Sequence, residues 1–206
     1  YKKQSGGHGQ YGHVKMTFEP SGDMDTPYVF EQTVVGGAVP KNFFPAVEKG
    51  IAESVKKGPL AAYPVTGIKA VLYDGSYHPV DSSEMAFKVA TQQAFKKGIM
   101  EAKPVLLEPI ATLKVVVPEG YTGDVMGELN KRRARVMGMN PTDNGYQEIV
   151  ADIPYLELYG YNATLRSMTS GSGTFSYEFA RYEQAPDDVA AKQIEERASK
   201  LVEVEE

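Results

Sequence analysis

The sequence predicts an α+β fold organised as two domains, and three observations support this expectation. The chain has 206 residues, of which 42% are hydrophobic and 24% charged, an ordinary globular composition that at this length favours two compact domains. Strand-like and helix-like patterns alternate along its whole length. At Pro104 a helical pattern stops and an apolar strand pattern follows, because proline pushes the preceding residue out of helical geometry. We therefore expect one domain over residues 1–103, a second over 104–185, and a terminal helix or tail over 186–206.

The first domain is expected to contain strands, two helices and two glycine-containing loops. Val14, Met16 and Phe18 alternate with polar residues, which indicates a strand with one buried face. Asp81, followed three positions later by Glu84, resembles a capping box, so Asp81 and Ser82 are expected to cap a helix. The other expected elements are strands near residues 28–35 and 65–73, a helix from Pro45 to Gly58, a turn at residues 74–76, and an end of the second helix at Gly98.

The second domain shows the element order βαββαβ, which defines the split βαβ, ferredoxin-like arrangement. Asn144-Gly145 lies between two strand-like runs and is the strongest short signal for a hairpin. Beyond Pro186, apolar residues spaced among charges indicate one terminal helix. The expected elements are a strand at residues 113–117, a helix at 123–136, a short strand, a strand around 149–153, a helix at 155–168 and a strand at 174–182.

Composition narrows the classes of function. Cysteine is absent, which excludes disulfides, thiolate metal sites and cysteine nucleophiles and makes the cytoplasm the default location. The net charge is −5, but the acidic excess lies mostly in the terminal segment, so a neutral or basic face elsewhere can still meet phosphate. No apolar run approaches the roughly 18 residues of a membrane span, and no signal peptide is recognisable. Because the chain starts at Tyr1 rather than methionine, we expect it to be an internal part of a longer protein or to begin at an artificial boundary.

The first glycine-containing loop, at residues 7–12, formally matches the dinucleotide pattern G-x-G-x-x-G. That fingerprint needs a strand before it and a helix after it, whereas a strand follows here, so we reject a dinucleotide site. No phosphate-loop motif occurs anywhere, and we expect this chain to hydrolyse no nucleotide. Two interpretations of the loop remain: a simple turn, or a loop whose bare backbone N–H groups approach RNA beside Lys2, Lys3 and Gln4.

The second loop combines serine, histidine and aspartate, but a serine hydrolase is not expected. Nucleophilic catalysis needs these groups to converge from well-separated positions, and neighbours in one loop rarely do so. His78 lies outside the helix-capping positions and is either an inert surface residue or a group that hydrogen-bonds RNA. The three histidines have no spacing typical of metal ligands, so we expect no metal site.

A basic run follows in the second domain: Lys131, Arg132, Arg133 and Arg135. These residues have two equally supported interpretations, a solvated helix end that complements the helix dipole, or a contact with RNA phosphates. The sequence also leads us to expect core or near-core positions for Met85, Met126, Tyr159 and Tyr161.

Taken together, the two loops resemble the two signature segments of the fourth domain of elongation factor G. These segments are KQSGGHGQYGHV at residues 3–14 and YDGSYHPVDSSEMAFK at residues 73–88. Residues 58–64, 103–109, 122–127 and 160–167 match the same family in the same order. The resemblance covers the chain from Tyr1 to about Pro186.

This resemblance implies a fold and a role for each domain. The first domain would be domain IV, with a fold like the second domain of small-subunit ribosomal protein five, and the second domain would be the ferredoxin-like domain V. In the family, the end of domain IV enters the decoding-site A site during translocation and contacts tRNA and mRNA. The implied RNA-binding residues are Gln4, Ser5, Gly6, Gly7, His8, Gln10, Ser76, Tyr77 and His78. Domain V would approach ribosomal RNA of the large subunit, with Lys131, Arg132, Arg133 and Arg135 as candidate contacts.

The resemblance also implies what this chain lacks. GTP and magnesium would bind in a G domain of a longer, ribosome-stimulated GTPase, so this part would be no enzyme and would carry no cofactor. The expected partners are the ribosome, tRNA, mRNA and ribosomal RNA, and the expected state is a monomer. Four residues depart from the usual family pattern: His8, Pro79, Ala134 and Ser172. They leave open an elongation factor G-like paralogue that acts in ribosome recycling or another ribosome-bound role.

Overall fold

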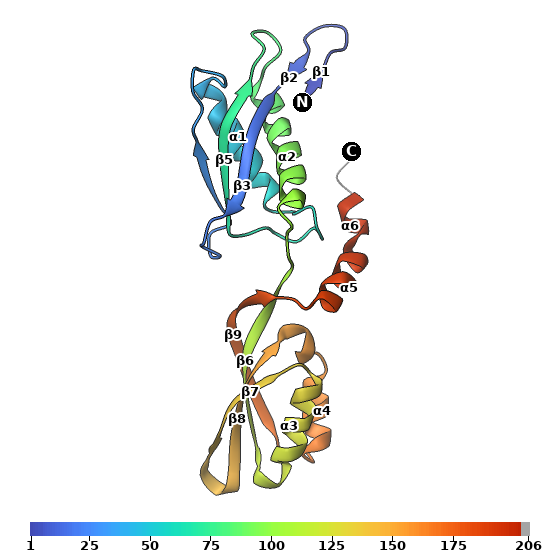
Figure 1. Cartoon of the computed structure of the whole chain (residues 1–206). Coiled ribbons are helices and arrows are strands. Elements are labelled where there is room, and N and C mark those ends of the chain that lie inside the picture. Colours follow the sequence, from blue (N-terminus) through green and yellow to red (C-terminus); the bar gives the residue numbers. More distant parts are fainter. Residues whose placement is uncertain (203–206) are drawn as a thin grey trace. The chain divides into compact units, whose positions relative to one another are not determined.

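The computed structural model describes residues 1–202, and its backbone contacts divide the chain into two units (Figure 1). The first unit comprises Tyr1–Pro104 together with the segment that starts at Asp188, and the second comprises Val105–Asp187. The terminal helix thus belongs to the first unit, although it follows the second unit in the sequence. The last part of the expected tail, residues 203–206, lies outside the described residues. No helix in residues 1–202 combines the length and apolar character needed to cross a membrane.

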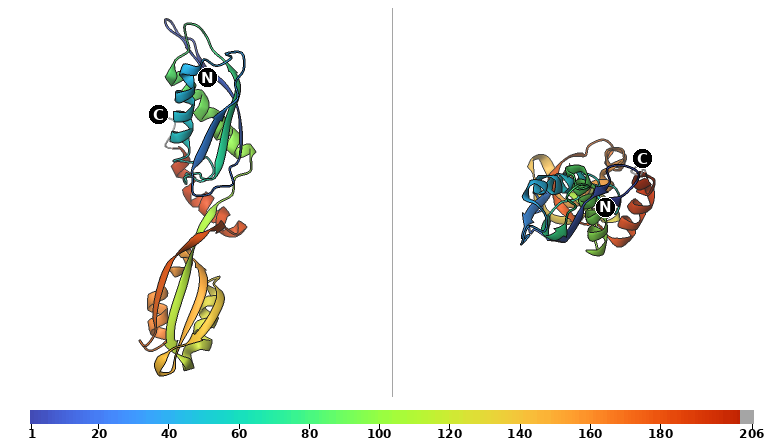
Figure 2. Two further views of the ribbon diagram at one scale, coloured as in Figure 1. Left: turned by 90° about the vertical axis from the view of Figure 1, so that its left-hand side faces the viewer. Right: turned by 90° about the horizontal axis from the view of Figure 1, so that it is seen from above.

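In the first unit, two helices cover one face of a three-stranded sheet (Figures 1 and 2). The strand order is β3-β5-β4, with β3 antiparallel and β4 parallel to the central β5. A short two-stranded ribbon, β1-β2, precedes the sheet. The elements are β1 (Lys2–Lys3), β2 (Gln10–Tyr11), β3 (His13–Pro20), β4 (Tyr28–Gln32), η1 (Lys41–Phe43), α1 (Phe44–Ser54), β5 (Ile68–Ser76) and α2 (Glu84–Glu101).

The core of the first unit follows from two sequence periods. Alternate residues of β3 and β5 point to one face, and the apolar stripes of α1 and α2 pack against that face. Val47 and Ile51 of α1 and Phe87 and Phe95 of α2 are almost completely buried, and each contributes about 2 kcal/mol of transfer free energy. The helices approach closely at Gly50, where a Cβ atom would lie 2.9 Å from Cβ of Thr91.

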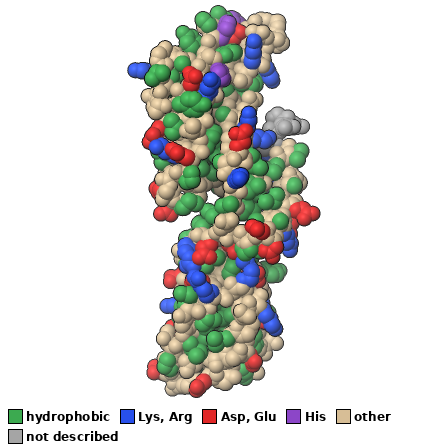
Figure 3. Space-filling view, viewed as in Figure 1, with side chains coloured by type: hydrophobic (Ala, Val, Ile, Leu, Met, Phe, Trp, Pro, Cys, Tyr) green, Lys and Arg blue, Asp and Glu red, His purple; other side chains and the backbone are tan. Residues whose placement is uncertain are grey.

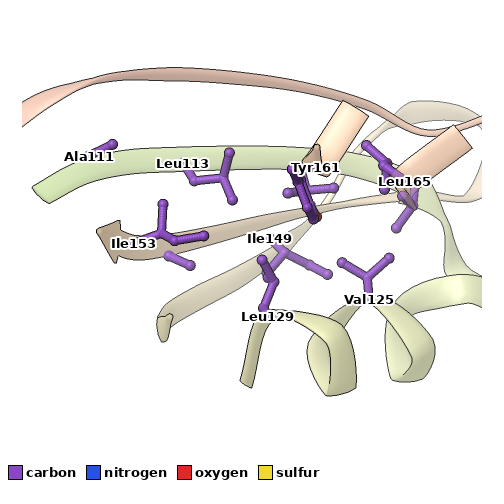
Figure 4. Close-up of a cluster of buried hydrophobic side chains, with 11 residues drawn as sticks. Ala111, Leu113, Val125, Leu129, Ile149, Ile153, Tyr161 and Leu165 are labelled. Atoms are coloured by element: carbon purple, nitrogen blue, oxygen red, sulfur yellow. The ribbon is translucent and has the colours of Figure 1, made fainter. Parts of the chain in front are cut away.

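The second unit has the ferredoxin-like topology expected from the sequence. Its four strands lie in the order β7-β8-β6-β9, and each is antiparallel to its neighbours. Helices α3 and α4 cover the face of this sheet that carries the core. Figure 4 shows this core, with Leu113, Ile149 and Leu129 among its buried side chains. The elements are β6 (Leu107–Pro118), η2 (Glu119–Tyr121), α3 (Thr122–Lys131), β7 (Arg135–Pro141), η3 (Asp143–Gly145), β8 (Tyr146–Pro154), η4 (Tyr155–Leu158), α4 (Tyr161–Met168) and β9 (Thr174–Gln184).

Several expected boundaries were wrong, for local reasons. The helix expected at residues 155–168 is two pieces, because Gly160 has a left-handed φ of 72° between η4 and α4. Helix α3 ends at Lys131 instead of residue 136, since Arg133 has a φ of 56° and β7 starts two residues later. The turn expected at residues 74–76 is instead the end of β5, which pairs with β3 there.

Four residues were expected at core or near-core positions, and this expectation was correct for one of them. Tyr161 is fully buried, whereas Met85 is 61% and Tyr159 92% exposed, and Met126 is also exposed. An apolar residue at helical spacing can lie on the solvent side of its helix, and Tyr159 lies just before the bend at Gly160.

The terminal helices α5 (Asp187–Arg197) and α6 (Ser199–Val202) end the described chain, and α5 is attached to the first unit by specific contacts. The Arg197 guanidinium donates hydrogen bonds to the carbonyl oxygens of Ala61 and Ala62, at 2.7 and 3.1 Å. The same guanidinium lies 3.7 Å from the ring centroid of Tyr63, whose hydroxyl donates to the Gln193 side chain at 2.8 Å. Ala62 has a left-handed φ of 59°. Three side chains therefore anchor the terminal helix.

We expect Arg197→Ala to release α5 from the first unit. The change removes two charge-assisted hydrogen bonds and a cation–π contact, which together stabilise the docked helix by about 2 kcal/mol. Native-state amide hydrogen exchange of α5 should accelerate accordingly. Lys192→Ala is the control, because Lys192 lies on the same helix, is 74% exposed and pairs only with Glu196 among the described residues. Equal exchange in the two variants would contradict the anchoring role.

Candidate nucleic-acid interface

Two loops, far apart in sequence, meet at one end of the first unit. The first loop, residues 4–9, joins β1 to β2, and the second loop, residues 77–83, joins β5 to α2. We call the two loops together the tip. The backbone N–H of Tyr11 donates to the Asp81 carbonyl at 2.9 Å, and the Ser82 hydroxyl donates to the Tyr11 carbonyl at 2.8 Å. A third bond runs from the Gly9 N–H to a carboxylate oxygen of Asp81 at 3.1 Å. The loops therefore form one hydrogen-bonded structure.

The glycine pattern that resembled a dinucleotide motif is explained by close approach. A Cβ atom at Gly9 would lie 2.7 Å from the Asp81 carboxylate, and one at Gly12 would lie 2.5 Å from the carbonyl oxygen of Ala86. Real Cβ atoms are not found at such distances, and at Gly12 the neighbour is backbone that cannot move aside, so only glycine lets the chain after β2 pass this close to the start of α2. The pattern serves contact between the loops and the helix.

Beneath the tip, a small polar network ties β2, β3 and β5 together. The Ser76 hydroxyl forms hydrogen bonds with the Tyr11 hydroxyl and with Nδ1 of His13, the latter at 2.7 Å. Tyr11 also lies beside His78, with ring centroids 6.3 Å apart and the ring planes inclined by 51°. Ser76, expected as an RNA contact, is half-buried and holds the base of the tip.

The second loop folds around His78. Nδ1 of His78 accepts hydrogen bonds from the backbone N–H groups of Val80 at 3.2 Å and Asp81 at 3.0 Å. The backbone N–H of His78 donates to the Ser82 hydroxyl at 2.9 Å. Ser82 therefore bonds only backbone groups and faces no imidazole, which leaves the serine hydrolase arrangement without its geometry.

The expected helix caps were wrong. The N-cap of α2 is Ser83, whose hydroxyl accepts a hydrogen bond from the Ala86 N–H at 3.1 Å. Asp81 and Ser82, expected as caps, instead bind the first loop and β2. The sequence therefore predicted correctly that a serine caps α2, but it placed the cap at Ser82, one residue too early.

The structure brings together all the residues expected at the tip, with different exposure. Residues 4–8 are all exposed, Gln10 is half-buried, and Tyr77 and the His78 side chain are 48% and 45% exposed. Histidine side chains lie at this end of the first unit in Figure 3. Sequence reasoning missed Tyr11 and gave Asp81 the wrong role, because pairing across about 70 residues leaves no local signal. Within residues 1–202, no three histidine, aspartate or glutamate side chains are grouped to hold a metal ion.

The basic run of the second unit is largely engaged inside the protein. Arg132 pairs with Glu128, donates to the carbonyl oxygens of Glu157 and Tyr159, and lies 5.2 Å from the ring centroid of Tyr161. The hydroxyl of buried Tyr161 has no hydrogen-bond partner among the described residues, and burial raises the pKa of Tyr161 to about 12. Arg132 therefore covers one side of the core.

Arg133 forms a two-pronged ion pair with the buried carboxylate of Glu108, at 2.9 and 3.0 Å, and a further bond with Glu157. The hydrogen bonds to Glu108 raise the pKa of the Arg133 guanidinium. Arg135 is 69% exposed and lies 3.4 Å from Asp152. Lys131 is exposed and has no carboxylate within 4.0 Å among residues 1–202. Of the four expected contacts, Lys131 and Arg135 are thus the ones open to an external phosphate.

Comparison with known proteins identifies the chain. The family model described as elongation factor G, domain IV, matches residues 1–103, and the one described as elongation factor G C-terminus matches residues 105–193. An elongation factor G-like protein of Thermotoga maritima is 50% identical over 205 residues, which cover 100% of this chain and 30% of that protein. A crystal structure from Thermus thermophilus matches with a TM-score of 0.81 and 45% identity, covering 97% of this chain and 29% of that one.

Two folded units of these types, joined in this order, define part of a translation elongation factor. The chain belongs to the elongation factor G family and contains its domain IV and its C-terminal domain. The resemblance and the α+β fold expected from the sequence are therefore confirmed. The chain spans 30% of the length of the Thermotoga relative.

Substitution of two nearby cations of the second unit, Arg133 and Lys131, should change its stability by very different amounts. Arg133→Ala should lower the free energy of unfolding of the second unit by about 2 kcal/mol, because the Glu108 carboxylate would remain buried without its hydrogen-bond donors. Lys131→Ala should change it by less than about 0.5 kcal/mol, since the side chain is exposed. Native-state hydrogen exchange of β6 amides measures both. Similar effects from the two substitutions would show that the Glu108 pair is not structural.

Proposed function

We propose that this chain is the ribosome-engaging part of a translation elongation GTPase that promotes movement of tRNA and mRNA. In this proposal the tip contacts tRNA and mRNA in the decoding-site A site. Membership of the elongation factor G family supports the ribosome as partner. The single observation that carries the proposal is that two exposed loops are held together as one structure by hydrogen bonds centred on Tyr11 and Asp81.

The chemistry of the tip suits RNA recognition that ignores sequence. An A-form minor groove is wide and shallow and presents ribose hydroxyls and backbone oxygens at every step. The side-chain amide of Gln4, the imidazole of His78 and the bare N–H groups of Gly6 and Gly7 are exposed groups that can bind such oxygens. A factor that moves every codon needs contacts of this kind.

The remaining expectations belong to the longer factor. We propose that GTP and magnesium bind in a G domain elsewhere in that protein, which works as a cytoplasmic monomer. Ribosomal RNA is proposed to meet Lys131 and Arg135 of the second unit, because both cations are exposed, and Lys131 has no carboxylate within 4.0 Å among residues 1–202. Arg132 and Arg133 support that surface by their internal ion pairs.

A second candidate is a paralogue that acts in ribosome recycling. Two exposed tip residues favour it, since His8 and Pro79 stand where the usual family pattern has a cationic and an acidic residue. The Thermotoga relative is itself described as elongation factor G-like. Subunit-splitting assays with the recycling factor, run beside translocation assays, separate the two candidates. Splitting without translocation would establish the second.

In the longer factor, His78→Ala and Gln4→Ala should each slow single-round movement of tRNA and mRNA about tenfold. That change corresponds to one lost hydrogen bond of about 1.4 kcal/mol in the rate-limiting state. Ribosome-stimulated GTP hydrolysis should stay nearly constant, because the tip lies outside any G domain. Lys192→Ala, on the terminal helix, serves as the matched control and should leave both rates unchanged. Reduced hydrolysis with normal movement would refute the role of the tip.

A further inference from the structure

The hydrogen bonds around His78 determine where its ring carries a proton. Two backbone N–H groups, from Val80 and Asp81, point at Nδ1. A backbone N–H can only donate, so Nδ1 must offer its lone pair. The neutral imidazole has one proton, which must then reside on Nε2. No group in residues 1–202 hydrogen-bonds Nε2, and the side chain is 45% exposed.

A competing description of the same ring is an ion pair. Nδ1 of His78 lies 3.7 Å from a carboxylate oxygen of Asp81, a contact that would require a proton on Nδ1. That proton would point toward the two N–H groups at 3.0 and 3.2 Å, and the arrangement would lose both bonds. The shorter contacts decide for the neutral ring with an unprotonated Nδ1.

Asp81 connects this ring to the first loop. The backbone N–H of Asp81 donates a hydrogen bond to Nδ1 of His78, and its backbone carbonyl accepts one from the Tyr11 N–H. The Asp81 carboxylate accepts a third hydrogen bond from the Gly9 N–H. The side chain is only 14% exposed, so water competes little for these bonds. Asp81 is thereby bonded to both loops of the tip and to β2 at the same time.

We propose that the backbone N–H groups of Val80 and Asp81 hold His78 as the Nε2–H tautomer, and that Asp81 is a positioning residue whose carboxylate aligns the first loop beside it. The tip then presents a fixed N–H donor for an oxygen acceptor of the RNA backbone, a ribose hydroxyl or a phosphate oxygen. Such acceptors occur at every nucleotide, so a donor fixed in this way contacts any sequence. The inference rests on the proposed function for its RNA partner, whereas the tautomer rests on geometry alone.

Nitrogen NMR of the imidazole in this chain tests the geometry without a ribosome. We expect His78 in its neutral form to carry its proton on Nε2. In Asp81→Ala the Gly9 amide should lose its protection from hydrogen exchange, because the carboxylate that accepts its hydrogen bond is removed. The Nε2–H tautomer should persist, because residue 81 keeps its backbone N–H. Asp81→Asn keeps an oxygen acceptor and should restore the protection of the Gly9 amide toward that of the unmodified chain. A proton on Nδ1 in the unmodified chain, or an Asp81→Ala variant whose Gly9 amide stays equally protected, would overturn the inference.

A pair of amide replacements tests the donor in the longer factor. In His78→Gln the amide nitrogen can lie near the position of Nε2 and keeps the donor there. In His78→Asn the amide oxygen can replace Nδ1 as acceptor, but the shorter side chain does not carry its NH2 donor to the position of Nε2. We expect single-round movement with the Gln variant to be several-fold faster than with the Asn variant. Asp81→Ala should slow movement, and Asp81→Asn should recover most of the rate. Circular dichroism establishes that each variant is folded.

The outcomes separate the two levels of the proposal. If His78→Ala leaves movement unchanged, the proposed function of the tip fails, whatever the tautomer. If His78→Ala slows movement but the Gln and Asn variants are equal, or Asp81→Ala moves tRNA normally, the positioning role fails while the proposed function stands.

Discussion

The arrangement of the first unit depends on how the backbone of Tyr11 is held by the second loop. Its N–H and its carbonyl bind Asp81 and Ser82, and the next residue but one begins β3. Ser83, the residue after Ser82, is the N-cap of α2. The contact therefore lies where α2 and the edge strand β3 start. It requires glycine at position 12, where a Cβ atom would meet the backbone of Ala86, whereas at Gly9 a Cβ atom would meet the Asp81 carboxylate. The same hydrogen bonds therefore join the two loops of the tip and bring β2 against the start of α2.

The second unit shows how tertiary structure distributes charges that are adjacent in sequence. Consecutive residues of a chain leaving a helix point in different directions, so Arg132 covers Tyr161 while Arg133 reaches Glu108 on β6. Glu108 is almost fully buried, and a carboxylate in that position needs a bidentate partner to offset its desolvation. A basic run of four residues thus divides into two arginines held by internal ion pairs and two exposed cations, of which Arg135 also lies near Asp152.

Much of the fold could be predicted from residues close in sequence. Alternation at Val14, Met16 and Phe18 indicated the strand β3, and the βαββαβ order indicated the ferredoxin-like sheet. The helix boundaries were predicted wrongly where the backbone conformation of a single residue interrupts an apolar pattern. Gly160 interrupts an apolar period that continues on both sides of it, and Arg133 adopts a left-handed φ that no propensity of arginine predicts. Ser83, rather than Ser82, caps α2, because three consecutive polar residues compete for that position and only their distant partners decide.

The sequence by itself determined the βαββαβ order of the second unit, the two folded types and the family, because periodicity and two signature loops are local properties of the chain. It also located the tip residues, since Gln4 to His8 and Tyr77 to His78 lie in those loops. Only the tertiary structure decided which contacts those residues make. Asp81 meets Gly9 across 72 positions, and two backbone N–H groups choose the tautomer of His78. Such contacts arise when the chain folds back on itself, and hydrogen-bond direction depends on angles and distances that residue order does not contain.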